Sequence, residues 1–138
     1  MDRATLERNQ SDPNMKESSR RQALRPSQGG MLSLKLADEV ARLKAKGEWA
    51  SENRLAASLV KNDALNIVLM VLKKDARLAE HHTKGPIAVQ VFSGCVRLRA
   101  RGQQVELSSG DIAALDREVV HDLEALEESV VLLTTAIA

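Results

Sequence analysis

From Leu55 to the C-terminus, the sequence is a series of short runs in which apolar residues recur at every second position. Turn-forming pairs such as Asn-Asp and Ser-Gly separate these runs. A period of two is that of a β-strand with one buried face, and short strands at regular spacing are typical of all-β sandwiches and barrels. The runs are LAASLV, ALNIVLMVL, IAVQVF, CVRLRA, QVEL, DIAAL, DLEAL and VVLLTTAIA. The sequence therefore predicts an all-β domain over residues 55–138.

Two of these runs, ALNIVLMVL at 64–72 and VVLLTTAIA at 130–138, are apolar on both faces. Such strands lie between two layers of one domain or between two subunits, and we therefore expect a homodimer. The run CVRLRA differs, because Arg97, Arg99 and the following Arg101 share one face. These arginines could form a phosphate-binding stripe, but we favour a solvent-exposed sheet face.

The chain before this domain divides into two parts. Residues 1–30 are polar and carry both signs of charge, which predicts a disordered tail whose basic stretch KESSRRQALR could contact a partner. In residues 31–54, Leu36, Val40 and Leu43 recur at helical spacing. We expect a short amphipathic helix there, docked on the domain, and a linker in which Trp49 packs as an anchor.

Composition excludes several classes of function. The 138 residues are long enough for one core, and the net charge of +1 gives no strong field that would draw nucleic acid or an acidic membrane. One Phe, one Trp and no Tyr remove the stacking platforms of single-strand binders. No run is apolar enough to span a membrane. The single cysteine, Cys95, excludes an internal disulfide, so we expect a cytoplasmic protein.

The segment from Asp75 to His121 resembles the two sequence motifs of the cupin superfamily, which are small β-barrels of the jelly-roll type. The first family motif reads Gly, five residues, His-x-His, three or four residues, Glu, six residues, Gly. On this chain, its positions fall on Asp75, His81, Thr83, Ile87 and Gly94. The stretch HHTKGP at 81–86 is also similar to small cupins whose first motif reads His-x-Thr-x-Gly-Pro.

The second family motif reads Gly, five residues, Pro-x-Gly, two residues, His. Here its positions fall on Gly110, Asp116, Glu118 and His121. The spacing fits at every step of both motifs, although the family residue itself is retained at few of them. The resemblance implies an RmlC-like jelly roll over about residues 55–138, as in small single-domain bacterial cupins, with a degenerate metal motif.

Backbone chemistry at the motif turns leads to the same fold. Glycine enters the left-handed region at low cost, so we expect positive φ at Gly94 and Gly110, which follow serines at hairpin turns. Asp75 can adopt the same conformation at a turn, because its side chain hydrogen-bonds locally. Glu118 adopts it poorly, which predicts a turn that is either remodelled or strained.

The family's metal set consists of three histidines and a glutamate, and the resemblance maps it onto His81, Thr83, Ile87 and His121. Two imidazoles without a carboxylate hold a Zn²⁺, Ni²⁺ or Fe²⁺ ion weakly. Since side chains alternate along a strand, His81 and His82 do not both face inward. The aligned register favours His81, whereas a slip of one residue would bring in Glu80 and His82, giving a two-histidine, one-carboxylate set with His121.

The leading hypothesis for function is a cupin that binds a small molecule in its barrel. His81, Thr83 and His121 would contact an oxyanion or carbonyl, and Ile87 and Val89, with Leu69 as a further candidate, would form an apolar lining. Gln90 should face away from the pocket, and Cys95 should be a small buried residue rather than a nucleophile.

Two alternatives remain open. One is a metal-dependent cupin enzyme of the dioxygenase or isomerase type, which would need a metal with open positions. The other is a structural or regulatory barrel that binds a partner protein, with the basic tail as its contact.

Overall fold

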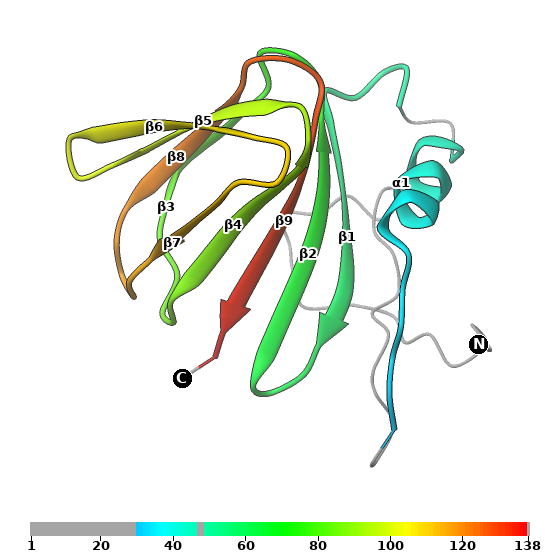
Figure 1. Cartoon of the computed structure of the whole chain (residues 1–138), viewed down its shortest axis with the longest axis horizontal. Coiled ribbons are helices and arrows are strands. Elements are labelled where there is room, and N and C mark those ends of the chain that lie inside the picture. Colours follow the sequence, from blue (N-terminus) through cyan, green and yellow to red (C-terminus); the bar gives the residue numbers. More distant parts are fainter. Residues whose placement is uncertain (1–29, 47–48, 138) are drawn as a thin grey trace.

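A computed structural model describes residues 30–46 and 49–137 of the chain. One helix, α1 (Leu36–Lys44), precedes the strands β1 (Arg54–Lys61), β2 (Leu65–Leu72), β3 (Arg77–His81), β4 (Ile87–Ser93), β5 (Cys95–Ala100), β6 (Gln103–Ser108), β7 (Ile112–Leu115), β8 (His121–Ala125) and β9 (Ser129–Ala136). The strands form two antiparallel sheets, in the orders β1-β2-β9-β4-β7 and β3-β8-β5-β6. Figure 1 shows the sheets facing each other, with α1 beside β1. The predicted all-β class is confirmed.

Every alternating run of the sequence forms a strand, and β3 is the strand that the run pattern did not contain. Its sequence RLAEH has a single buried apolar residue, Leu78, and both Ala79 and Glu80 are exposed. A β-bulge interrupts its pairing with β8 between Leu78 and His81. A bulge inserts an extra residue and breaks the period of two, so the signal for a strand is lost there.

The space between the sheets is filled by the main core, to which both sheets contribute alternate residues. It includes Met70 and Leu72 of β2, Val89 of β4, and Leu98 and Leu123 of the opposite sheet. The absence of tyrosine and the scarcity of other aromatics leave this core to aliphatic side chains. Such a core is held by close packing of Val, Leu, Ile and Ala.

A second cluster, here called the outer cluster, covers the opposite face of β1 and β2. Leu43 of α1 is 1% exposed and packs there with Leu55, Leu69 and Val71, while Trp49 is partly buried at the edge. Both faces of the run ALNIVLMVL are therefore covered within one chain: the second sheet covers the inner face, and α1 covers the outer face. The expectation that Leu69 lines the barrel is wrong, since the alternation that puts Met70 inside puts Leu69 outside.

Polar contacts fix the helix and its linker against the sheet. The Lys44 ammonium pairs with Glu128 in the β8–β9 turn, and the ammonium groups of Lys44 and Lys73 lie 5.2 and 4.9 Å from the centroid of the Trp49 ring. A cation above an indole face is attracted by the ring quadrupole. Trp49 therefore acts as the anchor that the sequence predicted.

The arginine ladder of β5 is neither a free phosphate stripe nor a simply solvated face. Arg97 pairs with Glu106 and Glu124, and Arg99 pairs with Asp122 and Glu124, across the neighbouring strands. These are cross-strand ion pairs between residues that lie side by side on the sheet. The carboxylates neutralise both arginines.

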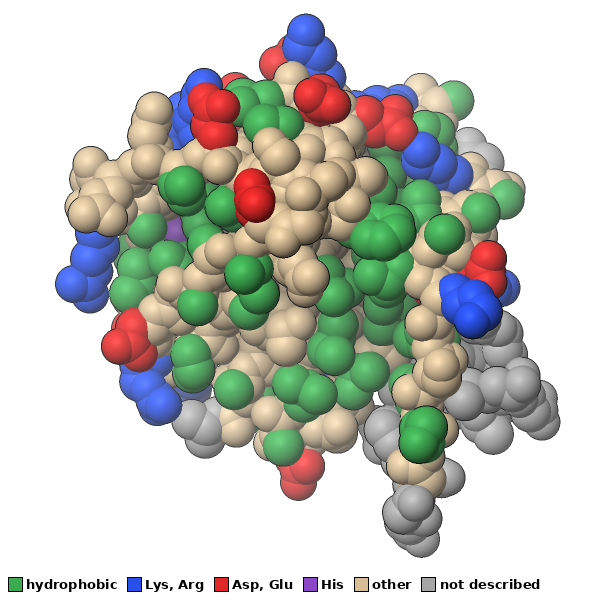
Figure 2. Space-filling model, viewed as in Figure 1, with side chains coloured by type: hydrophobic (Ala, Val, Ile, Leu, Met, Phe, Trp, Pro, Cys, Tyr) green, Lys and Arg blue, Asp and Glu red, His purple; other side chains and the backbone are tan. Residues whose placement is uncertain are grey.

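Beyond the outer cluster, the outer face of the five-stranded sheet is uncharged. The residues of this uncovered face are Ala88 and Gln90 of β4, Ile112 and Ala114 of β7, and Leu132 and Thr134 of β9. Gln90 is exposed and points away from the core, as predicted. In the view of Figure 2, hydrophobic side chains gather over the strands in the middle of Figure 1, and most charged side chains lie around the rim.

Two expectations concern other parts of the chain. The predicted disordered tail lies outside the described residues, apart from its last residue, Gly30. Within residues 30–46 and 49–137, no helix is long and apolar enough to cross a membrane.

The turns of the two motifs adopt the backbone conformation that the sequence predicted. Asp75, Gly94, Gly110 and Glu118 have φ values of 73°, 92°, 90° and 63°. All four glycine positions of the family pattern are thus left-handed, including the two that lack glycine. Glu118 keeps the turn and accepts the strain, because an L-residue in this region brings Cβ against a carbonyl oxygen.

Gly94 meets a second constraint. A Cβ atom built there would lie 2.3 Å from Ser129 Oγ and 2.4 Å from the Glu128 carbonyl oxygen. The Ser129 hydroxyl accepts a hydrogen bond from the Cys95 N–H at 3.0 Å and is 2.8 Å from the Glu127 carbonyl oxygen. The β4–β5 turn is thus locked against the β8–β9 turn. Cys95 itself is half-buried, less than predicted.

We predict that Gly94→Ala lowers the free energy of unfolding by about 2 to 5 kcal/mol, because backbone strain adds to a clash with the β8–β9 turn. Gly110→Ala is the matched control, since its φ of 90° is similar but nothing lies within 4 Å of its Cβ position. It should cost only the strain, about 1 to 2 kcal/mol. Urea unfolding of the two variants measures the difference, and equal costs would contradict the packing argument.

Glu118→Gly should stabilise the protein by about 0.5 to 1 kcal/mol. Glycine removes the strain of the left-handed conformation, and the higher entropy of the unfolded chain offsets part of this stabilisation. Glu118→Gln is the control that keeps the strain and removes the charge facing His82. The side chains of both His82 and Glu118 are more than half exposed, so this variant should stay within about 0.5 kcal/mol of wild type. Thermal unfolding compares the three proteins; a destabilised Glu118→Gly would show that the side chain matters more than the strain.

Candidate functional site

Two histidines that are distant in the sequence meet at one end of the sandwich. β3 ends at His81, β8 begins at His121, and the two residues are direct partners in the antiparallel pairing of these strands. His121 is two residues from Leu123, which belongs to the main core, so His121 lies on the inner face of its sheet. The bulge before His81 sets this register.

The His121 ring is held in one orientation. The residue is 4% exposed, and its Nδ1 lies 2.9 Å from the backbone carbonyl oxygen of Val119. A carbonyl only accepts hydrogen bonds, so Nδ1 donates to it and this contact orients the ring.

The residues of the alternative register lie elsewhere. The side chain of His82 is 55% exposed, and its Nε2 lies 3.3 Å from a carboxylate oxygen of Glu118. Glu80 sits in the bulge and is exposed. The structure thus gives His82 and Glu80 surface positions, while His121 is buried.

Thr83 belongs to the loop between β3 and β4 and connects the two motifs. Its hydroxyl donates to the Gly85 carbonyl oxygen at 2.7 Å, and its own carbonyl oxygen accepts from the Glu118 N–H at 2.8 Å. The hydroxyl proton is therefore used within the loop. Thr83 contributes to the site chiefly by fixing the loop of the first motif against the turn of the second.

The apolar candidates lie on the opposite sheet. Ile87 and Val89 are 4% and 1% exposed, and Val89 packs in the main core. Ile87 begins β4 and pairs with Thr135 of β9 on one side and with Leu115 of β7 on the other. Thr135 in turn pairs with Asn66 of β2, so a polar residue lies in line with Ile87 across the sheet. Sequence reasoning missed Asn66, although it is the polar residue within the apolar run ALNIVLMVL.

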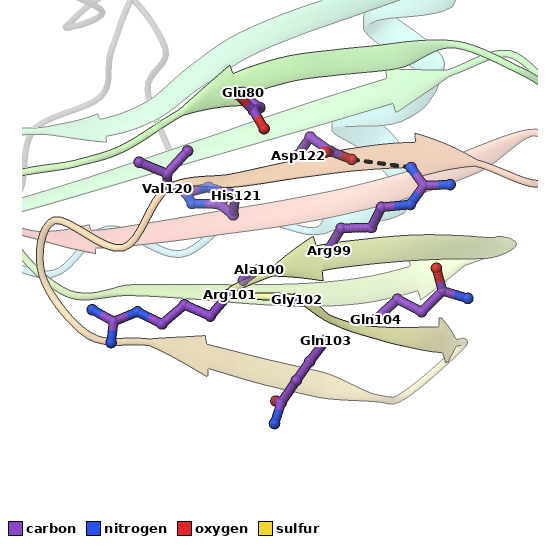
Figure 3. A pocket seen from close by; sticks show the side chains of 10 residues that line it. All are labelled: Glu80, Arg99, Ala100, Arg101, Gly102, Gln103, Gln104, Val120, His121 and Asp122. Atoms are coloured by element: carbon purple, nitrogen blue, oxygen red, sulfur yellow. Dashed lines mark hydrogen bonds and ion pairs between the residues drawn. The ribbon is translucent and has the colours of Figure 1, made fainter.

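A surface hollow of about 380 Å³ adjoins His121 at the ends of β5 and β8, as Figure 3 shows. The polar side chains of its lining include Glu80, Arg99, Arg101, Gln104, His121 and Asp122. Ligand pockets are mostly apolar, and Ile87 and Val89 are not part of this lining. The hollow differs in this respect from the apolar pocket that the sequence predicted.

Electrostatics argue against an anion site built on Arg99. Its two terminal nitrogens lie 3.2 Å from Asp122 Oδ1 and 3.3 Å from Glu124 Oε1. The hydrogen bond to Asp122 raises the pKa of the guanidinium above its ordinary value, and Glu124 adds to the effect. The positive charge of Arg99 is therefore compensated within the sheet.

The donor set does not fit a tightly held metal ion. Among the described side chains, no three His, Cys, Asp or Glu residues lie close enough together to share one. Ile87, where the family pattern has a glutamate, has no donor atom, and the Thr83 hydroxyl is bonded within its loop. Open catalytic metal sites usually have three protein ligands.

Comparison with known proteins places the fold. No family model and no curated protein matches the sequence. A conserved protein of unknown function from Streptococcus pyogenes is 22% identical, with a TM-score of 0.60 over 64% of this chain and 77% of that one. An RmlC-like cupin from Shewanella frigidimarina is 20% identical, with a TM-score of 0.59 over 62% and 78%.

A larger protein shares the architecture as well. A mutant of salicylate 1,2-dioxygenase from Pseudoaminobacter salicylatoxidans is 17% identical, with a TM-score of 0.64 over 77% of this chain and 34% of that one. At these identities the likeness concerns the fold. The chain therefore has the fold of RmlC-like cupins.

Proposed function

We propose that the protein binds a small molecule between its sheets and that His81 and His121 contact the polar end of this ligand. The observation that carries the proposal is the direct pairing of these two histidines on β3 and β8. Their positions are 40 residues apart in the sequence, 81 against 121, and only the strand pairing brings them together.

The environment of His121 supports this proposal. His121 is 4% exposed, and the Val119 carbonyl oxygen accepts a hydrogen bond from its Nδ1 and so orients the ring at the end of the sandwich. Apolar residues of the facing sheet, such as Ile87, supply surface for the body of a ligand. The ligand that fits is small and largely apolar, with one carboxylate or carbonyl oxygen for the imidazoles.

A weakly bound Zn²⁺, Ni²⁺ or Fe²⁺ ion is the second form of the same proposal, with His81 and His121 as its protein ligands. When bound, such an ion would supply a positive charge that attracts a carboxylate. A metal-dependent enzyme would need more ligands than these two, and the likeness to salicylate 1,2-dioxygenase concerns the fold alone.

We predict that benzoate, used as a simple apolar carboxylate, binds the wild-type protein with a Kd of about 1 mM. His121→Ala should weaken binding at least about tenfold, because it removes a buried group that meets the carboxylate. His82→Ala is the matched control, since this adjacent histidine is 55% exposed and should not affect binding. Ligand-observed NMR titration measures all three proteins.

Equal binding by wild type and His121→Ala would contradict the proposed site. Elemental analysis of the purified proteins separates the two forms of the proposal. One equivalent of metal that His121→Ala removes and His82→Ala retains would favour the metal form.

We also propose that the uncovered face of the five-stranded sheet packs on a second copy of this chain. The face has no charged residue. Its member Ile112 is 59% exposed, and Phe92, which follows the face residues of β4 near the end of that strand, is 46% exposed. It continues the outer cluster without a break at Leu132. Residues 1–29 are rich in both signs of charge, so this segment is a poor cover for an apolar face. In a dimer with twofold symmetry, this face of one copy would pack against the same face of the other copy.

Phe92→Lys should convert the dimer to a monomer, because it places a charge in an apolar interface. Val105→Lys is the control, since Val105 is 45% exposed but lies on β6 of the other sheet. Sedimentation velocity at micromolar concentration measures the change. A monomeric wild type, or a dimer that only Val105→Lys dissociates, would overturn this assignment.

A further inference from the structure

Asn66 lies on the inner face of β2, opposite the paired histidines. The residues two, four and six positions further along this strand, Val68, Met70 and Leu72, all belong to the main core between the sheets. The pairing of β2 with β9 is unbroken from Leu65 to Leu72, so no bulge reverses the alternation. The Asn66 carboxamide is therefore directed toward the space between the sheets.

The carboxamide oxygen of Asn66 is buried and has no hydrogen-bond partner among the described residues. Its partners across the neighbouring strands, Lys61 and Thr135, do not donate to it. Buried polar atoms in native proteins are nearly always hydrogen-bonded, so an exception needs an explanation. A group that a ligand satisfies is one such explanation.

Asn62, in the β1–β2 turn four residues before Asn66, shows how an asparagine with a structural role is bonded in this protein. Its side-chain oxygen accepts hydrogen bonds from the backbone N–H groups of Ala64 and Leu65, both at 2.8 Å. This arrangement fixes the β1–β2 turn. Asn66 has no comparable role in holding the backbone.

Asn66 and the histidines occupy the same end of the sandwich. Asn66 stands near the start of β2 and is joined through Thr135 to Ile87 at the start of β4. β3 ends at His81 and β8 begins at His121 on the facing sheet. Packed sheets are about 10 Å apart, a gap that one ring-sized molecule can span together with the side chains on both sides.

We infer that Asn66 is a ligand-binding residue whose carboxamide oxygen accepts a hydrogen bond from an O–H or N–H group of the bound molecule. The inference rests on the function proposed above and narrows its ligand to a class. That class is a small carboxylic acid that carries a hydroxyl or amino group at the end opposite the carboxylate. The carboxylate meets His81 and His121, and the donor group meets Asn66.

The first test needs no ligand. Asn66→Leu replaces the amide with an apolar side chain of nearly the same shape, so the melting temperature of the unliganded protein should stay unchanged or rise. Asn62→Ala should lower it by about 4 °C or more, because two backbone hydrogen bonds are lost. A fall in Asn66→Leu as large as that in Asn62→Ala would assign Asn66 a structural role and overturn the inference.

The second test uses two probes, benzoate and 4-hydroxybenzoate, which differ only by a hydroxyl group. Wild type should bind 4-hydroxybenzoate about fivefold more tightly than benzoate, and this ratio should fall to about one in Asn66→Leu. A ratio of one in wild type, or a ratio that Asn66→Leu leaves unchanged, would overturn the inference. Benzoate binding that His121→Ala does not weaken would instead contradict the proposed function, so the two failures are distinct.

Discussion

The pairing of β2 with β9 organises the rest of the structure. The two strands pair without interruption from Leu65 to Leu72, in the middle of a sheet that is apolar on both faces. A sheet of this kind is stable only when both faces are covered. One face is covered by the second sheet, and the other is covered over β1 and β2 by the helix and Trp49. The same unbroken alternation decides that Asn66 lies inside and Leu69 outside.

The sandwich is closed by aliphatic packing along most of its length, and the motif histidine of β8 lies at one end of its inner face. His121 is buried there, with one ring nitrogen bound to the Val119 carbonyl oxygen. The loop of the first motif and the turn of the second are joined by the hydrogen bond from the Glu118 N–H to the Thr83 carbonyl oxygen. The geometry of the motif is thus maintained by backbone contacts, even where its metal-binding side chains are replaced.

The motif turns show how backbone conformation persists without the usual residue. Asp75 and Glu118 adopt positive φ where the family pattern has glycine. The conformation is imposed by the strands on either side, whose pairing outweighs a local strain of about 1 to 2 kcal/mol. Gly94 has no such freedom, because the β8–β9 turn fills the space that a side chain would need.

Much of this arrangement could be predicted from the sequence, because a period of two and turn residues depend on local chemistry. Eight of the strands, the helix at Leu36–Lys44 and the left-handed turns follow from such local signals. The motif spacing likewise indicated that positions 81 and 121 belong to one site, and the structure pairs them. β3 escaped this reasoning, since its bulge removes the alternation on which the prediction depends.

Other features were decided only by tertiary structure. The sequence of ALNIVLMVL shows two apolar faces but not which one meets the helix, so the side on which Leu69 packs could not be known in advance. The same holds for Asn66, whose buried and unpartnered oxygen is a property of its surroundings. The carboxylates that neutralise Arg97 and Arg99 come from strands that are distant in the sequence. Periodicity fixes how residues alternate within one strand, whereas the contacts of each face depend on which strands pair and in which register.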